Sequence, residues 1–114
     1  MFPQQEYEAM TNIKKYVEQI GEELHDSKCY MEKALEYKSM GLNDPRNADR
    51  YNGYKTMSVQ ELEHSSRLHQ YAAEDIEQLK SVYPEIPPSM MEKWEKAHSE
   101  YVEKAAWIKQ MQSM

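Results

Sequence analysis

Apolar side chains recur at alternating intervals of three and four residues along most of the chain, and this spacing constrains the fold more than any other feature. In the first forty residues the series is Met10, Ile13, Val17, Ile20, Leu24, then Ser27, Met31 and Ala34 or Leu35. Such a spacing places all of these residues on one face of a long α-helix. The sequence therefore predicts a first helix over about residues 4 to 40.

A short turn segment then leads into a second helix. Residues 41–45 read Gly-Leu-Asn-Asp-Pro, in which Gly41 suits a left-handed helix end, Asp44 an N-cap and Pro45 a first helical turn. A loop this short predicts an antiparallel hairpin, with the second helix over about residues 45 to 82. Its inner stripe is Tyr51, Tyr54, Ser58, Glu61, Ser65, Leu68, Ala72, Asp75, Leu79 and Val82.

Prolines at positions 84, 87 and 88 interrupt the pattern, and a third helix is predicted over about residues 89 to 112. Ser89 and Glu92 have the spacing of a capping box. The apolar stripe of this helix is Met91, Trp94, Ala97 or His98, Tyr101, Ala105 and Ile108. We expect it to fold back along the second helix. Residues 1–114 are thus predicted to form one all-α domain, a long antiparallel helical hairpin plus a third helix.

Composition excludes several classes of partner. The net charge of -6 leaves no basic patch for a phosphate backbone and repels an anionic membrane. Cys29 is the only cysteine, so no intrachain disulfide or Cys-x-x-Cys metal pair can form. The N-terminus lacks the basic and apolar segments of a signal peptide, and no apolar run approaches the roughly 18 residues of a membrane span. We expect a cytoplasmic protein that binds neither nucleic acid nor membrane.

The length of the first two helices predicts a protein partner. A helix of about 37 residues rises roughly 55 Å, which is more than a lone three-helix chain covers well along its length. An exposed apolar stripe on such a hairpin is covered most simply by a second copy of the chain. We therefore expect a homodimer or a higher homo-oligomer.

The motif Glu-x-x-His, which places a carboxylate and an imidazole one helical turn apart, occurs at Glu22/His25, Glu61/His64 and Glu95/His98. The residues at heptad spacing from Glu22 and His25 are mostly polar, so this pair is predicted to face solvent. Glu61 shares its heptad column with Tyr54 and Leu68. Glu61 and His64 are therefore predicted to turn inward.

Glu23 is the natural partner of that pair, because it lies in a column of tyrosines beside the apolar seam. It is 17 residues before Met40, and Glu61 is 16 residues after Pro45. At 1.5 Å per residue, both lie roughly 25 Å from the turn of an antiparallel hairpin. Both are also near the middle of their helices. A twofold axis at this point would gather two copies each of Glu23, Glu61 and His64.

Four buried carboxylates need compensating charge, which two metal ions supply. Oxygen ligands with one imidazole per metal suit iron or manganese. The predicted set, a Glu from each of two helices and Glu-x-x-His from each of the other two, is the ligand set of di-iron carboxylate bundles.

Two segments resemble the first two metal-binding helices of the ferritin-like superfamily, in particular its rubrerythrin and short encapsulated-ferritin branches. They are Gly-Glu-Glu-Leu-His-Asp-Ser-Lys-Cys-Tyr over residues 21–30 and Glu-Leu-Glu-His-Ser-Ser-Arg-Leu-His over residues 61–69, and the likeness covers about residues 16 to 72. The resemblance implies that Glu23 bridges or caps a metal, Glu61 bridges, His64 is a terminal ligand and Tyr30 hydrogen-bonds a ligand carboxylate. It also implies a ferritin-like four-helix bundle completed by dimerisation.

Other candidate residues have structural alternatives. By the rise per residue, His98 should lie level with Ala72, roughly 12 to 16 Å from Glu61 and His64, so Glu95 and His98 are expected either to pack within one subunit or to serve as extra metal ligands. His69 is expected to be a packed or boundary histidine. Asp75 suits either a path by which cations enter or a partly wet interface. Most of the tyrosines and methionines have core spacing.

Two functions from different classes follow. The first is a homo-oligomeric di-iron protein that binds Fe(II) and passes its electrons to dioxygen or peroxide, as a ferroxidase or a peroxidase-like oxidoreductase. The second is a helical scaffold or assembly protein without metal, in which Glu23, Glu61 and His64 form a buried polar network that fixes register. The size of the oligomer, and whether its acidic surface docks in a larger protein shell, stay open.

Overall fold

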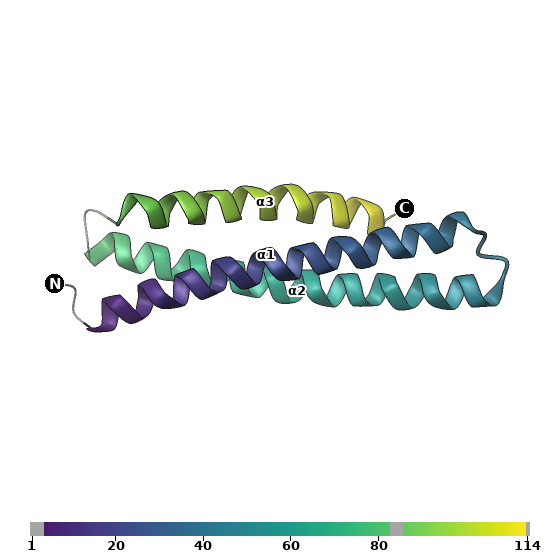
Figure 1. The fold of residues 1–114 in the computed structure, drawn as a ribbon, viewed down its shortest axis with the longest axis horizontal. Helices are drawn as coiled ribbons and strands as arrows, with labels where there is room; N and C mark the ends of the chain where they lie inside the picture. Colours follow the sequence, from purple (N-terminus) through teal and green to yellow (C-terminus); the bar gives the residue numbers. More distant parts are fainter. Residues whose placement is uncertain (1–3, 83–85, 114) are drawn as a thin grey trace.

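The computed structural model describes residues 4–82 and 86–113, and three helices make up almost all of them. These are α1 (Gln4–Ser39), α2 (Pro45–Val82) and α3 (Pro88–Gln112). α1 and α2 run antiparallel as a hairpin, and α3 lies along one side of it (Figure 1). Neither described range contains a strand. The predicted all-helical chain of three helices is confirmed, with bounds that differ by at most one residue.

The turn between α1 and α2 has the predicted conformation. Gly41 has a φ of 108°, a left-handed value that a glycine adopts without steric cost. The backbone N–H of Arg46 donates a hydrogen bond of 2.9 Å to Oδ1 of Asp44, which is therefore the N-cap of α2. Asn47 donates a further bond of 3.1 Å from Nδ2 to the Gly41 carbonyl. These contacts close the hairpin in a few residues.

α3 begins differently from the prediction, and the expected capping box at Ser89 and Glu92 is wrong. Pro87 is the N-cap residue, and no side chain makes a capping hydrogen bond. The Pro87 carbonyl instead accepts the N–H groups of Met90 and Met91, at 3.0 and 3.2 Å. Pro88 has a fixed φ and no N–H, so it suits the first helical position and starts the helix one residue earlier.

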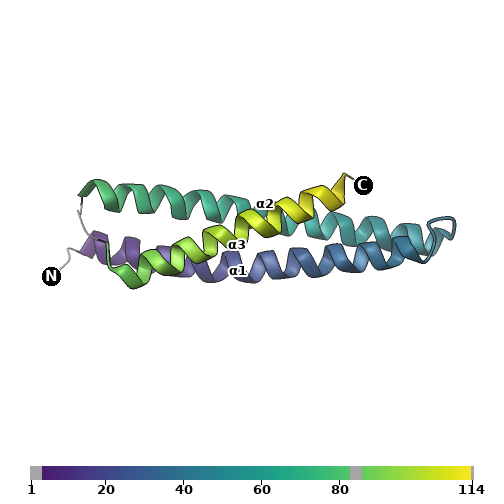
Figure 2. The same ribbon diagram turned by 90° about the horizontal axis from the view of Figure 1, so that it is seen from above.

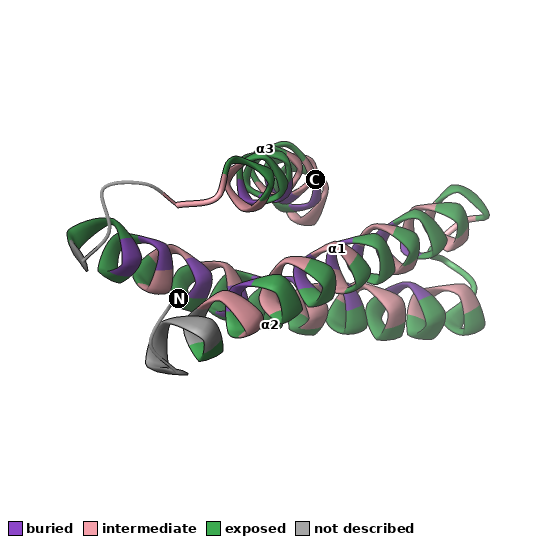
Figure 3. Ribbon diagram, turned by 60° about the vertical axis from the view of Figure 1, so that its left-hand side comes forward, coloured by how far each residue is buried: buried purple, intermediate pink, exposed green. Residues whose placement is uncertain are grey.

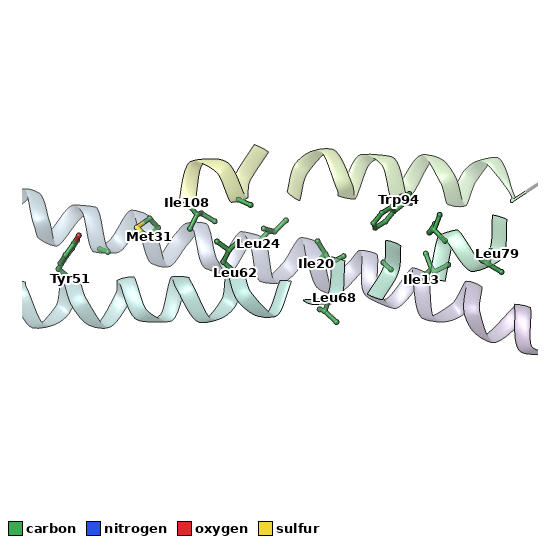
Figure 4. Packing of buried hydrophobic residues seen from close by; sticks show 14 residues of the cluster. Ile13, Ile20, Leu24, Met31, Tyr51, Leu62, Leu68, Leu79, Trp94 and Ile108 are labelled. Atoms are coloured by element: carbon green, nitrogen blue, oxygen red, sulfur yellow. The ribbon is translucent and has the colours of Figure 1, made fainter. Parts of the chain in front are cut away.

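The core follows the predicted stripes of all three helices (Figure 4). Its buried apolar members are Ile13, Ile20, Leu24, Met31, Ala34, Tyr51, Leu62, Leu68, Ala72, Ile76, Leu79, Trp94, Ala97, Ala105 and Ile108. Leu62 and Ile76 lie outside the predicted stripe of α2 and are buried on the side that α3 approaches. Figure 3 shows the buried residues lining the seams between helices, while the outer faces are exposed.

A pair of small residues joins the two helices of the hairpin. Ser27 of α1 and Ser58 of α2 are fully buried. Each hydroxyl donates to the carbonyl of the other residue at 2.7 Å, and the two hydroxyl oxygens are 3.1 Å apart. Buried hydroxyls need such partners, and larger side chains would hold the helices apart. This reciprocal contact fixes the distance and the register of α1 and α2.

α3 crosses the hairpin diagonally, from α1 at its start to α2 at its end (Figure 2). It packs mainly on α1 and only sparsely on α2, so the expectation that it folds back along the second helix is wrong. Its 25 residues also stop short of the hairpin turn, which projects beyond it as two helices alone (Figure 1). The described molecule is a rod of 62 × 20 × 17 Å. None of its described helices has a stretch long and apolar enough to cross a bilayer.

The serine contact gives the first testable prediction. Ser27→Val should lower the free energy of unfolding by about 1–3 kcal/mol, because a larger branched side chain is forced into a fully buried position and the reciprocal hydrogen bonds are lost. Urea denaturation measures this loss. Ser99→Val, at an exposed position of α3, is the control and should change stability by no more than about 0.5 kcal/mol. Equal losses in the two variants would show that the contact does not set the packing.

Candidate metal centre

The structure brings Glu23 of α1 and His64 of α2 into direct contact at the middle of the hairpin. Oε1 of Glu23 lies 2.7 Å from Nδ1 of His64, the length of a short, charge-assisted hydrogen bond. The Glu23 side chain is only 16% exposed, whereas that of His64 is 53% exposed. The carboxylate is therefore mostly withdrawn from water, and the imidazole covers it from the outside.

Glu23 is held in an electrostatically unfavourable place. Burial raises the pKa of this carboxyl above its ordinary value of 4.5; the His64 imidazole opposes that shift, and the negative charge of Glu61 adds to it. Its second oxygen, Oε2, is buried and has no hydrogen-bond partner among the described residues. A buried carboxylate oxygen without a partner is costly.

Glu61 and His64 differ in depth. Glu61 is half-buried, as predicted from its column, and is near enough to raise the pKa of Glu23. His64 is exposed, not turned inward as predicted. It shares its column with Met57 and Tyr71, whose exposed fractions are 41% and 48%. This column forms the outer edge of the hairpin because no third helix lies over it.

α3 covers the other side of the seam. Val17, Ile20, Gly21 and Leu24 on α1, and Val59, Leu62, Glu63 and Ser66 on α2, border gaps that are lined on their other side by α3. At 100° per residue, Glu23 and Glu61 point away from these positions, across the seam. We call the side that carries them the uncovered face. Its members are Tyr16, Glu23, Tyr30 and Tyr37 on α1, and Tyr54, Met57, Glu61, His64 and Tyr71 on α2.

Tyrosines flank the acidic centre on both sides along this face. Tyr16 and Tyr71 are 6.3 Å apart between ring centroids. Toward the turn, Tyr54 stacks between Tyr30, at 6.3 Å, and Tyr37, at 5.8 Å. Tyr30, the predicted partner of a ligand carboxylate, is thus about 10 Å along α1 from Glu23 and packs on Tyr54. The uncovered face combines a central polar cluster with aromatic surfaces at each end.

The other predicted candidates lie elsewhere. Glu22 and His25 are exposed, as expected, and Nε2 of His25 lies 3.6 Å from Sγ of Cys29. Glu95 is exposed on α3 and does not reach the centre. Asp75 is half-buried, and burial together with the Glu74 charge raises its pKa.

His98 was expected near Ala72, but it meets His69, three residues nearer the centre. Nε2 of His69 and Nδ1 of His98 are 2.7 Å apart. His69 was expected to be packed, and it does stack on Tyr101. Its direct pairing with His98 was missed. The signal was its place seven residues after Leu62 and seven before Ile76, in the column of α2 that α3 approaches.

One chain does not complete a metal site. No group of three or more His, Cys, Asp or Glu side chains within residues 4–82 and 86–113 is arranged to hold an ion. Glu23, Glu61 and His64 nevertheless supply the oxygen and imidazole donors that suit iron or manganese. A second set of the same residues would be needed to enclose a pair of ions.

No protein-family model, curated protein or solved structure matches this chain.

Glu23 predicts a distinctive pH dependence of the metal-free protein. Because its pKa is higher in the folded than in the unfolded state, folding takes up a proton in the interval between the two values. The free energy of unfolding should therefore rise as the pH falls through the raised value, and level off below 4.5. Glu23→Gln should remove this component and be at least as stable as the wild type at neutral pH. Urea denaturation from about pH 4 to 8 compares the two.

Matched control measurements use Glu22→Gln, at the exposed neighbouring position, which should keep the wild-type pH dependence. If the difference between wild type and Glu23→Gln were flat across this range, the Glu23 carboxyl would be ordinarily solvated.

Proposed function

We propose that two copies of this chain pair through the uncovered face and form a ferritin-like di-iron centre that oxidises Fe(II) with dioxygen or peroxide. The observation that carries the proposal is the gathering of Glu23, Glu61 and His64 at the middle of a face that α3 leaves open, with one Glu23 oxygen buried and unpartnered. The same three residues lie in the two segments that resemble the rubrerythrin and short encapsulated-ferritin branches.

The shape of the hairpin supports a twofold pairing at this point. The centre lies near the middle of both α1 and α2, so an axis through it superposes the two half-sites while the helices of each copy cover those of the other. Met57 and Tyr71 expose apolar surface at the edge of the face, and the half-buried tyrosines extend it toward both ends. Four helices then surround the acidic centre as a bundle.

The donor set supports a pair of iron ions. Two Glu23, two Glu61 and two His64 provide four carboxylates and two imidazoles, and the ions neutralise charge that is otherwise costly to bury. Glu61 would bridge, Glu23 would cap or bridge, and His64 would be terminal. Each His64 would turn from its present hydrogen bond with Glu23 to the metal, and Oε2 of Glu23 would gain a partner. Manganese has a similar preference for these donors.

Bound iron would supply the redox chemistry, and Glu23, Glu61 and His64 would hold it. Two ferrous ions as substrate lose one electron each. With two protons, these electrons reduce one dioxygen to hydrogen peroxide, or one hydrogen peroxide to two waters. The raised pKa of the Glu23 carboxyl favours its holding a proton before metal arrives and releasing it on binding.

A second candidate, the scaffold without metal, is favoured by one observation. The 2.7 Å bond between Glu23 and His64 already forms a paired polar contact within a single chain. In that case the same residues fix register between helices and subunits. The two candidates differ in what happens to the protein when iron is added.

Iron content tests the proposal. Protein purified and loaded with Fe(II) should hold about one iron per chain, the number implied by two ions per pair. Glu61→Ala should reduce bound iron to background because it removes the bridging ligand. Glu22→Ala, one residue from Glu23 but exposed, is the matched control and should keep full iron. Stoichiometric iron that survives Glu61→Ala would place the site elsewhere.

Stability with and without a chelator separates the two candidates. An ion bound only by the folded pair raises the melting temperature, by mass action. Equal melting temperatures for metal-free and iron-loaded protein, with a dimeric solution mass in both, would establish the scaffold and rule out the di-iron centre.

A further inference from the structure

The contact between His69 of α2 and His98 of α3 is independent of the proposed metal centre and lies on the covered side of the hairpin. The facing nitrogens are 2.7 Å apart, and the ring centroids are 4.9 Å apart. The centroid distance of 4.9 Å is close to the sum of the 2.7 Å between the nitrogens and the distance from each nitrogen to the centre of its own ring. The two nitrogens therefore lie nearly on the line between the centroids. The imidazoles thus meet end to end, with one nitrogen directed straight at the other.

This arrangement suits a shared proton. A four-coordinate metal ion needs two nitrogens that converge on one point from an angle, which end-to-end rings do not offer. One N–H donating to one lone pair satisfies the contact, whether the pair carries no extra proton or one. With two extra protons, both facing nitrogens carry a hydrogen. The contact then has two positively charged donors and no acceptor, so the hydrogen bond is lost.

The two rings of the pair differ in their environment, because His69 is half-buried among aromatic rings and His98 is exposed. His69 stacks on Tyr101 at 4.3 Å and lies 5.2 Å from Trp94, and Trp94 is 5.7 Å from His98. On α1, Val17, Ile20, Gly21 and Leu24 border a gap with Ala97 of α3, and none of these four has a titratable side chain. Nearer the start of α3, Lys14 and Glu18 of α1 border a second gap with Lys93.

Charged groups near the pair lie on α2 and on α3. Glu63 of α2 borders the same gap as Tyr101 and Lys109. Lys93, Lys96 and Glu100 border the α1 side, and Glu95 is exposed one turn before His98. On α2, the residues one turn from His69 are serines and alanines, at 65, 66, 72 and 73. Burial and the neighbouring His98 both lower the pKa of His69 below its ordinary value of 6.5.

The pair also lies where α3 is weakly attached. α3 packs mainly on α1, and its contacts with α2 are few. The end-to-end histidines are the hydrogen bond that the structure gives between side chains of α2 and α3. Loss of that bond would leave α3 on α1 and weaken its attachment to α2, where the ring contacts of His69 with Trp94 and Tyr101 remain.

We infer that His69 and His98 form a proton-operated latch, which holds α3 on α2 while at most one of the two rings is charged and releases it when both are. The sign follows from linkage: a histidine whose pKa is lower in the folded state favours the unfolded or released state as the pH falls below 6.5. The latch is closed at neutral pH and opens as the pH falls below 6.5.

Imidazole ¹⁵N NMR of the full chain tests the latch directly. In the wild type, His69 and His98 should titrate as a coupled pair, with two separate steps that both rings report. His98→Gln should convert the His69 titration into a single step at higher pH, because one of the two causes of its lowered pKa is gone. Single-step titrations of His69 that are identical in the wild type and in His98→Gln would overturn the latch.

Stability against pH is the second measurement. The urea midpoint of the wild type should fall between about pH 7 and 5 relative to that of His69→Gln, which keeps a hydrogen-bonding side chain that does not titrate. Glu23 titrates in both proteins, so its opposite contribution cancels in the difference. His25→Gln, at an exposed position of α1, is the control and should follow the wild type. A wild-type curve parallel to that of His69→Gln would also overturn the latch.

Discussion

The reciprocal hydrogen bonds between Ser27 and Ser58 determine which residues of α1 and α2 face one another. They occur where small side chains let the two backbones approach, and their directionality fixes the register as well as the distance. In an antiparallel pair, the turn before Ser27 lies opposite the turn after Ser58. Glu23 therefore comes level with Glu61 and His64. A slip of one helical turn would separate the carboxylate from the imidazole and remove the candidate centre.

The two sides of this hairpin have different polar chemistry. On the side that α3 covers, His69 of α2 and His98 of α3 form a polar contact within the chain. The uncovered face carries an acidic cluster, in which one oxygen of Glu23 is buried and has no partner among the described residues. Acidification acts on them in opposite directions, since it protonates the Glu23 carboxyl, which burial disfavours as an anion, and charges the His69 imidazole, which burial favours as neutral.

Much of this arrangement could be predicted from the sequence, and the reason is the simplicity of the helix. A regular period decided the three helices and most of their buried residues. The constant rise per residue was enough to bring Glu23 level with Glu61 and His64 across a short turn. Gly41 and Asp44 could be identified because each conformation they adopt favours a particular residue type. These features depend on one helix, or on two joined by a fixed turn.

The missed features depend on contacts between helices that no single period encodes. The diagonal path of α3 is set by how side chains interlock on α1 and α2, so neither the pairing of His69 with His98 nor the burial of Leu62 followed from spacing alone. The exposure of His64 reflects where α3 is absent. The start of α3 at Pro88 shows that two adjacent prolines outweigh a serine with the right spacing.

The projecting end of the rod has a consequence for how the molecule comes apart. Beyond the C-terminus of α3, the hairpin has no third helix over it, and its members there include Met40, Leu42 and the stacked rings of Tyr37 and Tyr54. Local opening events begin where the fewest neighbours must be disrupted. Fraying should therefore start at the turn and proceed inward, and the buried serine pair stands between that frayed tip and the acidic centre.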